Sequence, residues 1–299
     1  MDIVTHAAMG IVLAAPFLDS HPAAAACFVF GAVLPDLDAL SRVLGKRAFL
    51  RWHQTYTHSL PLIAVVALAA WPVLRAAGVS DPWAAPALGI GMTLHALLDV
   101  TNTYGITLLA PFSKRRFSLE WVFFIDAFVL VATAVALTLV VRALAGGAGT
   151  STVAAAYGAV LAVYWTAKAL LRRRAARHAP PGTLALLPSA LVPWRFLGCA
   201  RVDDEVMTFS LNAVTGRRDD EQRRSVQDSS VGAALAELPE YRVMRDLSPA
   251  YHVVDAVADD EGTSIVCRDL RTRNFGGRFG TLSVRLDLDG RIVRSHFDA

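Results

Sequence analysis

The sequence predicts an α-helical polytopic membrane domain of about four to six helices, followed by a small α+β domain with an antiparallel sheet. Hydrophobic residues make up 54% of the 299-residue chain and charged residues only 18%, whereas average soluble proteins carry about 25% charged residues. The mean hydropathy is +0.42. The ionisable residues are also unevenly spread, because residues 1–177 carry 14 basic and 8 acidic side chains and residues 178–299 carry 15 and 18.

This composition excludes several other classes of protein. Disordered chains are poor in apolar residues, and three cysteines are too few for a disulfide scaffold. The 20 glycines and 14 prolines follow no repeat, which excludes a collagen-like fibre. We therefore expect a membrane domain over residues 1–177, a Pro-rich linker over 178–194 and a soluble cytoplasmic α+β domain over 195–299.

Six apolar runs cover most of the first domain. A helix needs about 20 apolar residues to cross a bilayer core of ~30 Å, and the last three runs reach that length. The first two are short, so each is either a crossing or a buried or re-entrant helix. The runs lie at residues 3–18, 22–34, 60–77, 84–104, 121–145 and 153–171.

Lys and Arg are concentrated in every second connection between these runs. Such residues mark cytoplasmic connections, so the pattern predicts six crossings with both termini in the cytoplasm. The chain is then a multi-pass protein of the plasma or inner membrane. The basic connections are 35–59, 105–118 and 172–177, and those without Lys or Arg are 17–22, 78–83 and 146–152.

The second domain has the alternating pattern of short strands. Asp289-Gly290 between two such runs predicts a hairpin. We expect one helix near residues 231–247, with Pro239 in its middle. No motif in this domain indicates a chemistry. The expected strands are 206–214, 251–257, 264–270, 280–287 and 291–297.

Histidines and acidic residues of the first domain lie near one predicted membrane face. Ionisable groups within or beside apolar helices are costly and seldom accidental. Their shared position therefore predicts a polar cluster at the ends of several helices. The residues are His6, Asp36, Asp38, His53, His58, His95, Asp99, Glu120 and Asp126.

Local spacing supports this convergence. His95 and Asp99 are four residues apart, so both project from one face of a helix. His58 lies in a loop that enters a helix, with Ser59 as the expected N-cap. Glu120 is expected in the first turn of the fifth helix, where the helix dipole favours a carboxylate.

Each of these residues alone has an ordinary structural explanation, such as a hydrogen-bonded histidine or a solvated turn. Four histidines and three aspartates together are costly unless a cation or mutual pairing compensates. Imidazole and carboxylate ligands without cysteine favour zinc, with manganese or iron as alternatives. Seven candidate ligands leave room for one or two ions. A bound metal activates water, and a spare carboxylate can act as general base, which points to hydrolysis.

The ordered set of motifs resembles the YdjM/DUF457 family of predicted membrane-bound metal-dependent hydrolases over about residues 1–130. The motifs are Thr5-His6…Gly10, Leu34-Pro35-Asp36-Leu37-Asp38, His53…Thr57-His58-Ser59-Leu60 and His95…Asp99…Asn102-Thr103-Tyr104-Gly105. The resemblance implies that the metal ligands are His6, Asp36, Asp38, His58, His95 and Asp99. Asp126 also matches the family. The chain departs from it at Gln54, where Arg is frequent, and at Asn102, where Ser is frequent.

We therefore expect a membrane-bound metal-dependent hydrolase that acts at the cytoplasmic membrane interface on a lipid-linked ester or phosphoester. Asp38, His53 and Asp126 are the expected catalytic or proton-carrying residues. Membrane lipids are the expected partners, and nucleic acid is not. Two alternatives stay open: a non-catalytic membrane protein whose polar cluster is structural, and a metal or proton transporter. The small number of long runs and the lack of a repeat disfavour the transporter.

Overall fold

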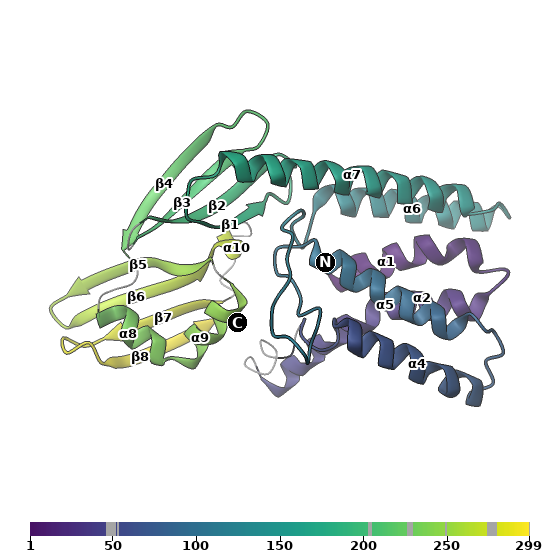
Figure 1. The fold of residues 1–299 in the computed structure, drawn as a ribbon, viewed down its shortest axis with the longest axis horizontal. Helices are drawn as coiled ribbons and strands as arrows, with labels where there is room; N and C mark the ends of the chain where they lie inside the picture. The colour runs from purple at the N-terminus through teal and green to yellow at the C-terminus, as the bar shows by residue number, and fades with distance from the viewer. Residues whose placement is uncertain are drawn as a thin grey trace. The chain divides into compact units, whose positions relative to one another are not determined.

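The computed structural model describes residues 1–45, 52, 54–202, 205–225, 230–248, 250–273 and 280–298. The chain forms two compact units, Met1–Lys168 and Ala169–Ala299. The first is helical, and the second contains two antiparallel sheets with short helices (Figure 1). This confirms the predicted fold class.

Six α-helices of the described residues correspond to the six apolar runs. Two 3₁₀ helices, η1 (Ala15–Phe17) and η2 (Leu34–Leu44), extend the first two of them. The C-terminal end of the sixth helix belongs to the second unit. The helices are α1 (Ile3–Ala14), α2 (Pro22–Val33), α4 (Leu60–Ala76), α5 (Ala84–Val100), α6 (Ala127–Ala145) and α7 (Ser151–His178).

Three of these elements are long and apolar enough to cross a membrane: α2 with η2 (Pro22–Leu44), α6 and α7. The other three apolar helices are shorter than these. They are α1 with η1 (Ile3–Phe17), α4 and α5. Apolar residues of α1, α6 and α7 form one buried core, which includes Val12, Val129 and Leu161. The number of crossings and the side on which the termini lie stay predictions.

Capping residues determine where two of the helices begin. The Oγ of Ser59 accepts a hydrogen bond from the backbone N–H of Leu62 at 3.4 Å, which confirms the predicted N-cap of α4. The Oδ1 of Asp126 accepts from the backbone N–H of Phe128 at 3.1 Å and so caps α6. Both caps satisfy amide groups that have no partner within the helix.

The segment before α6 differs from the prediction. The backbone N–H groups of Trp121 and Val122 donate to the carbonyl oxygen of Thr101 at 2.9 and 3.2 Å, so this segment is held against the end of α5. The helix therefore starts at Ala127 and not at residue 121. Glu120 has a left-handed φ of 52° and lies outside the helix, so its expected place in the first turn is wrong.

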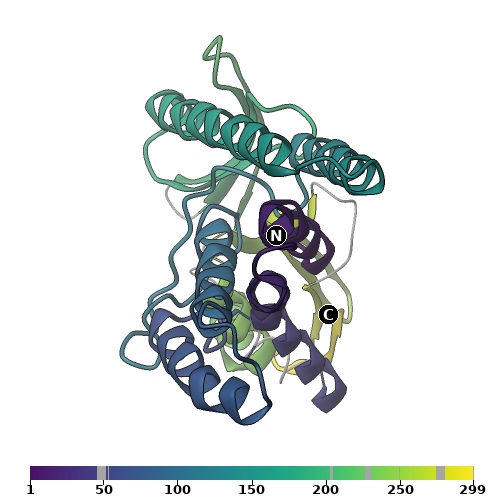
Figure 2. The same ribbon diagram turned by 90° about the vertical axis from the view of Figure 1, so that its right-hand side faces the viewer.

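Helix α5 packs against both α2 and α4 (Figures 1 and 2). Glycine permits the close approach of α2 and α5. A Cβ at Gly31 would lie 2.3 Å from the carbonyl oxygen of Leu88, and one at Gly91 would lie 2.2 Å from that of Phe28. The two backbones are thus in contact, which brings the end of α2 next to the last turns of α5.

The second unit contains two four-stranded antiparallel sheets with strand orders β1-β2-β3-β4 and β5-β6-β7-β8. The short helices are α8 (Ser230–Glu237), α9 (Pro239–Leu247) and α10 (Leu270–Arg273). The strands are β1 (Thr183–Pro188), β2 (Arg195–Val202), β3 (Glu205–Asn212), β4 (Arg218–Ser225), β5 (Tyr251–Asp259), β6 (Gly262–Asp269), β7 (Thr281–Leu286) and β8 (Ile292–Asp298).

The five expected strands of this unit correspond to β3 and β5–β8. Gly290, with a left-handed φ of 77°, lies in the predicted turn between β7 and β8. The expected linker over residues 178–194 contains β1, which pairs with β2. The expected single helix is two helices, because Pro239 begins the second one. The domain limits inferred from the sequence stay a prediction.

Candidate metal centre

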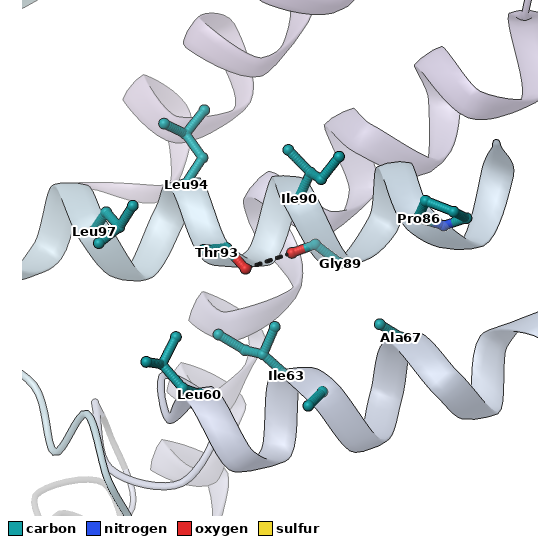
Figure 3. Close-up of a pocket in the computed structure, with 10 residues that line it drawn as sticks. Leu60, Ile63, Ala67, Pro86, Gly89, Ile90, Thr93, Leu94 and Leu97 are labelled. Atoms are coloured by element: carbon teal, nitrogen blue, oxygen red, sulfur yellow. Dashed lines mark hydrogen bonds between the residues drawn. The ribbon is translucent and has the colours of Figure 1, made fainter.

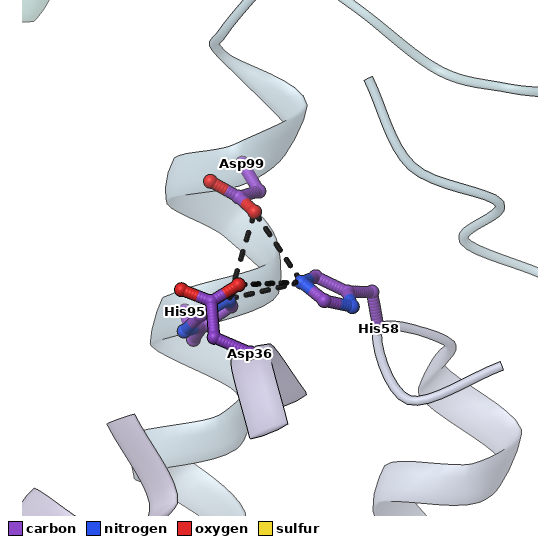
Figure 4. A group of neighbouring side chains, drawn as sticks. All are labelled: Asp36, His58, His95 and Asp99. Carbon is purple, nitrogen blue, oxygen red and sulfur yellow. Dashed lines mark hydrogen bonds and ion pairs between the residues drawn. The ribbon is translucent and has the colours of Figure 1, made fainter. Parts of the chain in front are cut away.

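Four polar side chains from three segments of the first unit meet at one buried place (Figure 4). Asp36 lies in η2, His58 in the loop before α4, and His95 and Asp99 in the last turns of α5. Each offers one ligand atom, and the four atoms all lie within 4.8 Å of one another. The structure thus brings together four of the six residues that were expected to bind metal.

The spacing of these atoms matches the coordination shell of a small cation. His58 Nε2 and His95 Nε2 are 3.0 Å apart, and each lies 3.5 Å from Asp36 Oδ1. Asp99 Oδ2 is 3.4 Å from His58 Nε2 and 3.5 Å from His95 Nε2. Around a tetrahedral zinc ion with bonds of about 2.0–2.1 Å, neighbouring donor atoms are roughly 3.3–3.4 Å apart. The four residues therefore fit a four-coordinate ion.

Asp99 presents its Oδ2 to this cluster, while its Oδ1 contacts groups outside the cluster. Its Oδ1 accepts a hydrogen bond from Asn102 Nδ2 at 3.0 Å and is in contact with the amino group of Met1. Its Oδ2 is buried and has no hydrogen-bond partner among the described residues. A buried carboxylate oxygen without a hydrogen bond is costly unless a cation lies beside it.

Both histidines are oriented by contacts on the far side of the ring. His95 Nδ1 donates to the carbonyl oxygen of Ala32 at 2.7 Å. His58 Nδ1 lies 3.0 Å from Thr57 Oγ1 and 3.5 Å from Asp38 Oδ2. These contacts leave Nε2 of each ring facing the cluster. Outer contacts of this kind fix the tautomer and the direction of metal-binding histidines.

The charge of His58 reflects the carboxylates around it. Burial lowers the pKa of His58, but the three aspartates whose oxygens lie 3.4–3.5 Å from its ring nitrogens outweigh burial and raise the pKa to about 10. Without a cation, His58 therefore holds a proton at neutral pH. A metal ion that binds there has to displace this proton, because only neutral imidazole ligates.

Asp38, expected as a ligand and a catalytic residue, is not one of the four clustered groups. Its Oδ2 accepts hydrogen bonds from the backbone N–H of Gln54 at 2.9 Å and from Thr57 Oγ1 at 2.6 Å. Gln54, which donates this backbone hydrogen bond, has a left-handed φ of 58°. Asp38 thus contacts the outer side of His58 and positions the ring.

His6, another expected ligand, lies directly beside the cluster. Its ring stacks on His95 with centroids 3.7 Å apart, and its Nε2 is 3.3 Å from Asp99 Oδ1. Its Nδ1 is buried without a hydrogen-bond partner among the described residues. His6 therefore has one ring nitrogen with unused hydrogen-bonding capacity next to the four donors.

Two further expected residues have other surroundings. Asp126 caps α6, accepts from the Tyr164 hydroxyl at 2.8 and 2.9 Å, and lies 4.0 Å from Lys168 Nζ. These partners come from α7, and Lys168 is fully buried. His53 lies outside the described residues. The expected catalytic roles of these two residues stay predictions.

Sequence reasoning did not assign a role at the site to several residues that support it. Thr57 and Gln54 lie next to predicted residues, but only the folded loop shows that they contact Asp38. The sequence could have identified Lys168, because a basic residue inside the apolar run of α7 requires a buried partner. The carbonyl group of Ala32 carries no side-chain signal at all.

Comparison with known proteins identifies the family of this chain. The sequence model of the YdjM inner membrane protein family matches residues 1–175, which include all four clustered residues. The uncharacterized protein YfhP of Bacillus subtilis (strain 168) is 24% identical over 271 residues, which cover 81% of each chain. No solved structure matches the chain significantly. The match over more than half of the chain shows that it belongs to the YdjM inner membrane protein family.

Proposed function

We propose that the chain is a membrane-bound metal-dependent hydrolase that acts at the cytoplasmic membrane interface on a lipid-linked ester or phosphoester. The observation that carries this proposal is the set of four buried donor atoms at the spacing of a cation's coordination shell. Family membership and the apolar helices support a location in the membrane. The position of the cluster at helix ends supports access from the interface.

The donor set indicates which metal the site holds. Two imidazole nitrogens and two carboxylate oxygens favour zinc, and manganese or iron accept the same donors. Four donors are sufficient for one ion. A second ion would need His6 and Asp38, and Asp38 is already engaged by Gln54 and Thr57.

The residues of the chain have separate roles in the proposed reaction. The four side chains alone fill a tetrahedral shell, so a divalent ion here would take a fifth ligand to hold a water with a pKa of about 7 and to polarise the substrate oxygen. Asp38 keeps the His58 ring in place through Thr57. We assign proton transfer to His6, because its buried Nδ1 is unpaired among the described residues and its ring contacts His95.

Elemental analysis of the purified full-length protein tests the site. We expect about one divalent ion per chain in the wild type and at least a tenfold loss in His58→Ala and His95→Ala, because each removes a ligand. His21→Ala is the matched control, since His21 is partly exposed and pairs with Asp81 instead. Equal metal content in all four proteins would overturn the proposal.

A panel of carboxylic and phosphoric esters then tests the reaction. We expect turnover that a chelator abolishes and added metal restores. Bound metal without any such turnover would favour the non-catalytic alternative. Metal or proton flux in proteoliposomes would identify the transporter instead.

A further inference from the structure

An apolar groove of about 580 Å³ runs along helices α4 and α5 (Figure 3). Small residues create the space, since Ala64 and Ala67 line it from α4 and Gly89 lines it from α5. A Cβ at Gly89 would lie 2.8 Å from that of Ala67, so the two helices nearly touch there. In Figure 3 Leu60 and Leu97 lie at one end of the lining.

The groove offers hydrocarbon contact and no free hydrogen-bonding group among its lining residues. The hydroxyl of Thr93 donates to the carbonyl oxygen of Gly89 in its own helix at 2.8 Å. The remaining lining side chains are apolar or glycine. A ligand of this surface is therefore an unfunctionalised hydrocarbon segment, and a sugar, nucleotide or peptide backbone would lose its hydrogen bonds there.

The groove is open on its outer side. Ile90 is 59% and Leu97 is 54% exposed. Both helices are 17 residues long and apolar, and the family is one of inner membrane proteins. Acyl chains of the bilayer are thus the hydrocarbon that can enter from the side, without first leaving the membrane.

One end of the groove lies at the same helix ends as the metal centre, but on another face of α5. Leu60 follows His58 by two residues, and Leu97 lies between His95 and Asp99. His58 reaches from the start of α4 to α5, where its Nε2 is 3.0 Å from that of His95. A chain that lies in the groove toward Pro86 therefore leaves its polar end at the helix ends that carry the cluster.

We propose that this groove holds one acyl chain of a long-chain lipid substrate and thereby holds the adjoining ester linkage at the helix ends that carry the metal centre. This inference rests on the proposed hydrolase function and names its substrate class. Within a bilayer the groove gains nothing from transfer out of water, so its preference for a chain comes from packing.

Photo-crosslinking tests where the chain binds. The full-length protein is reconstituted into phosphatidylethanolamine and phosphatidylglycerol vesicles with a trace of lipid that carries a diazirine at the end of one acyl chain. We expect labelling of α4 and α5 to fall at least about threefold in Ala64→Leu, which fills the groove from an exposed position. Ala69→Leu is the matched control, because Ala69 is exposed on the same helix and does not line the groove. Equal labelling of both variants would overturn the proposal.

The chain-length dependence of hydrolysis tests the consequence for the substrate. We expect Ala64→Leu to raise KM for a long-chain ester at least about threefold and to leave a four-carbon ester unchanged, because only the long chain reaches the groove. The same loss for both esters would overturn the proposal. If the wild type hydrolyses no ester, the hydrolase function fails, and the crosslinking result still decides whether the groove binds a chain.

Discussion

Asp36 and Asp38 are two residues apart but have different partners. They lie in η2, a 3₁₀ helix with about three residues per turn, so their side chains point about two thirds of a turn apart. Asp36 faces the two histidines, and Asp38 contacts Gln54 and Thr57. An Asp-x-Asp pattern does not show which residue faces the site, because that depends on the helix type and its rotation.

Asp38→Asn tests the positioning role of this carboxylate. The variant keeps the shape of the side chain and all four clustered donors, but it weakens the contact that orients His58. We expect metal affinity to fall about 10–100-fold. Competition with a chelator of known affinity measures this, with Asp19→Asn in an exposed loop as the control. Unchanged affinity would show that Asp38 does not position the ring.

A buried ion pair in the second unit gives a prediction for acid stability. Burial raises the pKa of Asp269, but Arg271, whose Nε donates to it at 3.0 Å, outweighs burial and holds the pKa below its usual range. The ion pair therefore stabilises the second unit above pH ~4, the usual pKa of Asp. This stabilisation is lost as pH falls through the pKa that Asp269 has in the folded state.

Asp269→Asn should therefore destabilise the second unit at neutral pH by roughly 3 kcal/mol, because it leaves Arg271 buried without its charge partner. The stability of the variant should also change less between pH 5 and pH 2. Hydrogen exchange of β5–β8 in the full-length protein measures both effects. Asp289→Asn, at an exposed turn, should match the wild type.

At the scale of elements, helices were easier to predict than strands. Two of the three missed strands, β1 and β4, are the edges of their sheet. An edge strand tolerates proline and charge, and β1 ends at Pro188 while β4 is almost wholly polar. Neither therefore has the alternating pattern that identified β3 and β5–β8. The central strand β2 was missed because it follows directly on the Pro-rich stretch.

The contact between helices α2 and α5 assembles the metal centre. Gly91→Ala should push α2 away from α5, because the new Cβ meets the carbonyl oxygen of Phe28. We expect a loss of about 1–3 kcal/mol in unfolding free energy, together with a loss of bound metal, because Ala32 and Asp36 move with α2. Thermal unfolding and elemental analysis in detergent measure the two effects.

Gly158→Ala is the control for this prediction. Gly158 also lies in a helix, but nothing is within 4 Å of the position of its Cβ. Alanine favours helix over glycine by up to ~1 kcal/mol, so this variant should be as stable as the wild type or more so. Equal destabilisation by both substitutions would show that close packing of α2 on α5 is not the cause.

At the scale of the whole molecule, the sequence predicted which residues could gather but not which of them would meet. Because successive helices run in opposite directions, every second connection lies at the same end of the helices. The cluster of polar residues could therefore be anticipated. Asp126 belongs to that same set of residues, yet it pairs with Tyr164 and Lys168 of α7. Sequence patterns place a residue along a helix, whereas the contacts between helices decide its partners.

The four clustered residues all lie on or beside α4, α5 and the end of α2, and the two long helices α6 and α7 supply none of them. X-ray absorption spectroscopy of the metal-loaded full-length protein tests this centre most directly. The structure predicts a shell of nitrogen and oxygen donors at about 2.0–2.1 Å with two imidazoles, which disappears in a His58→Ala/His95→Ala double variant. A sulfur shell, or the same spectrum from the double variant, would contradict it.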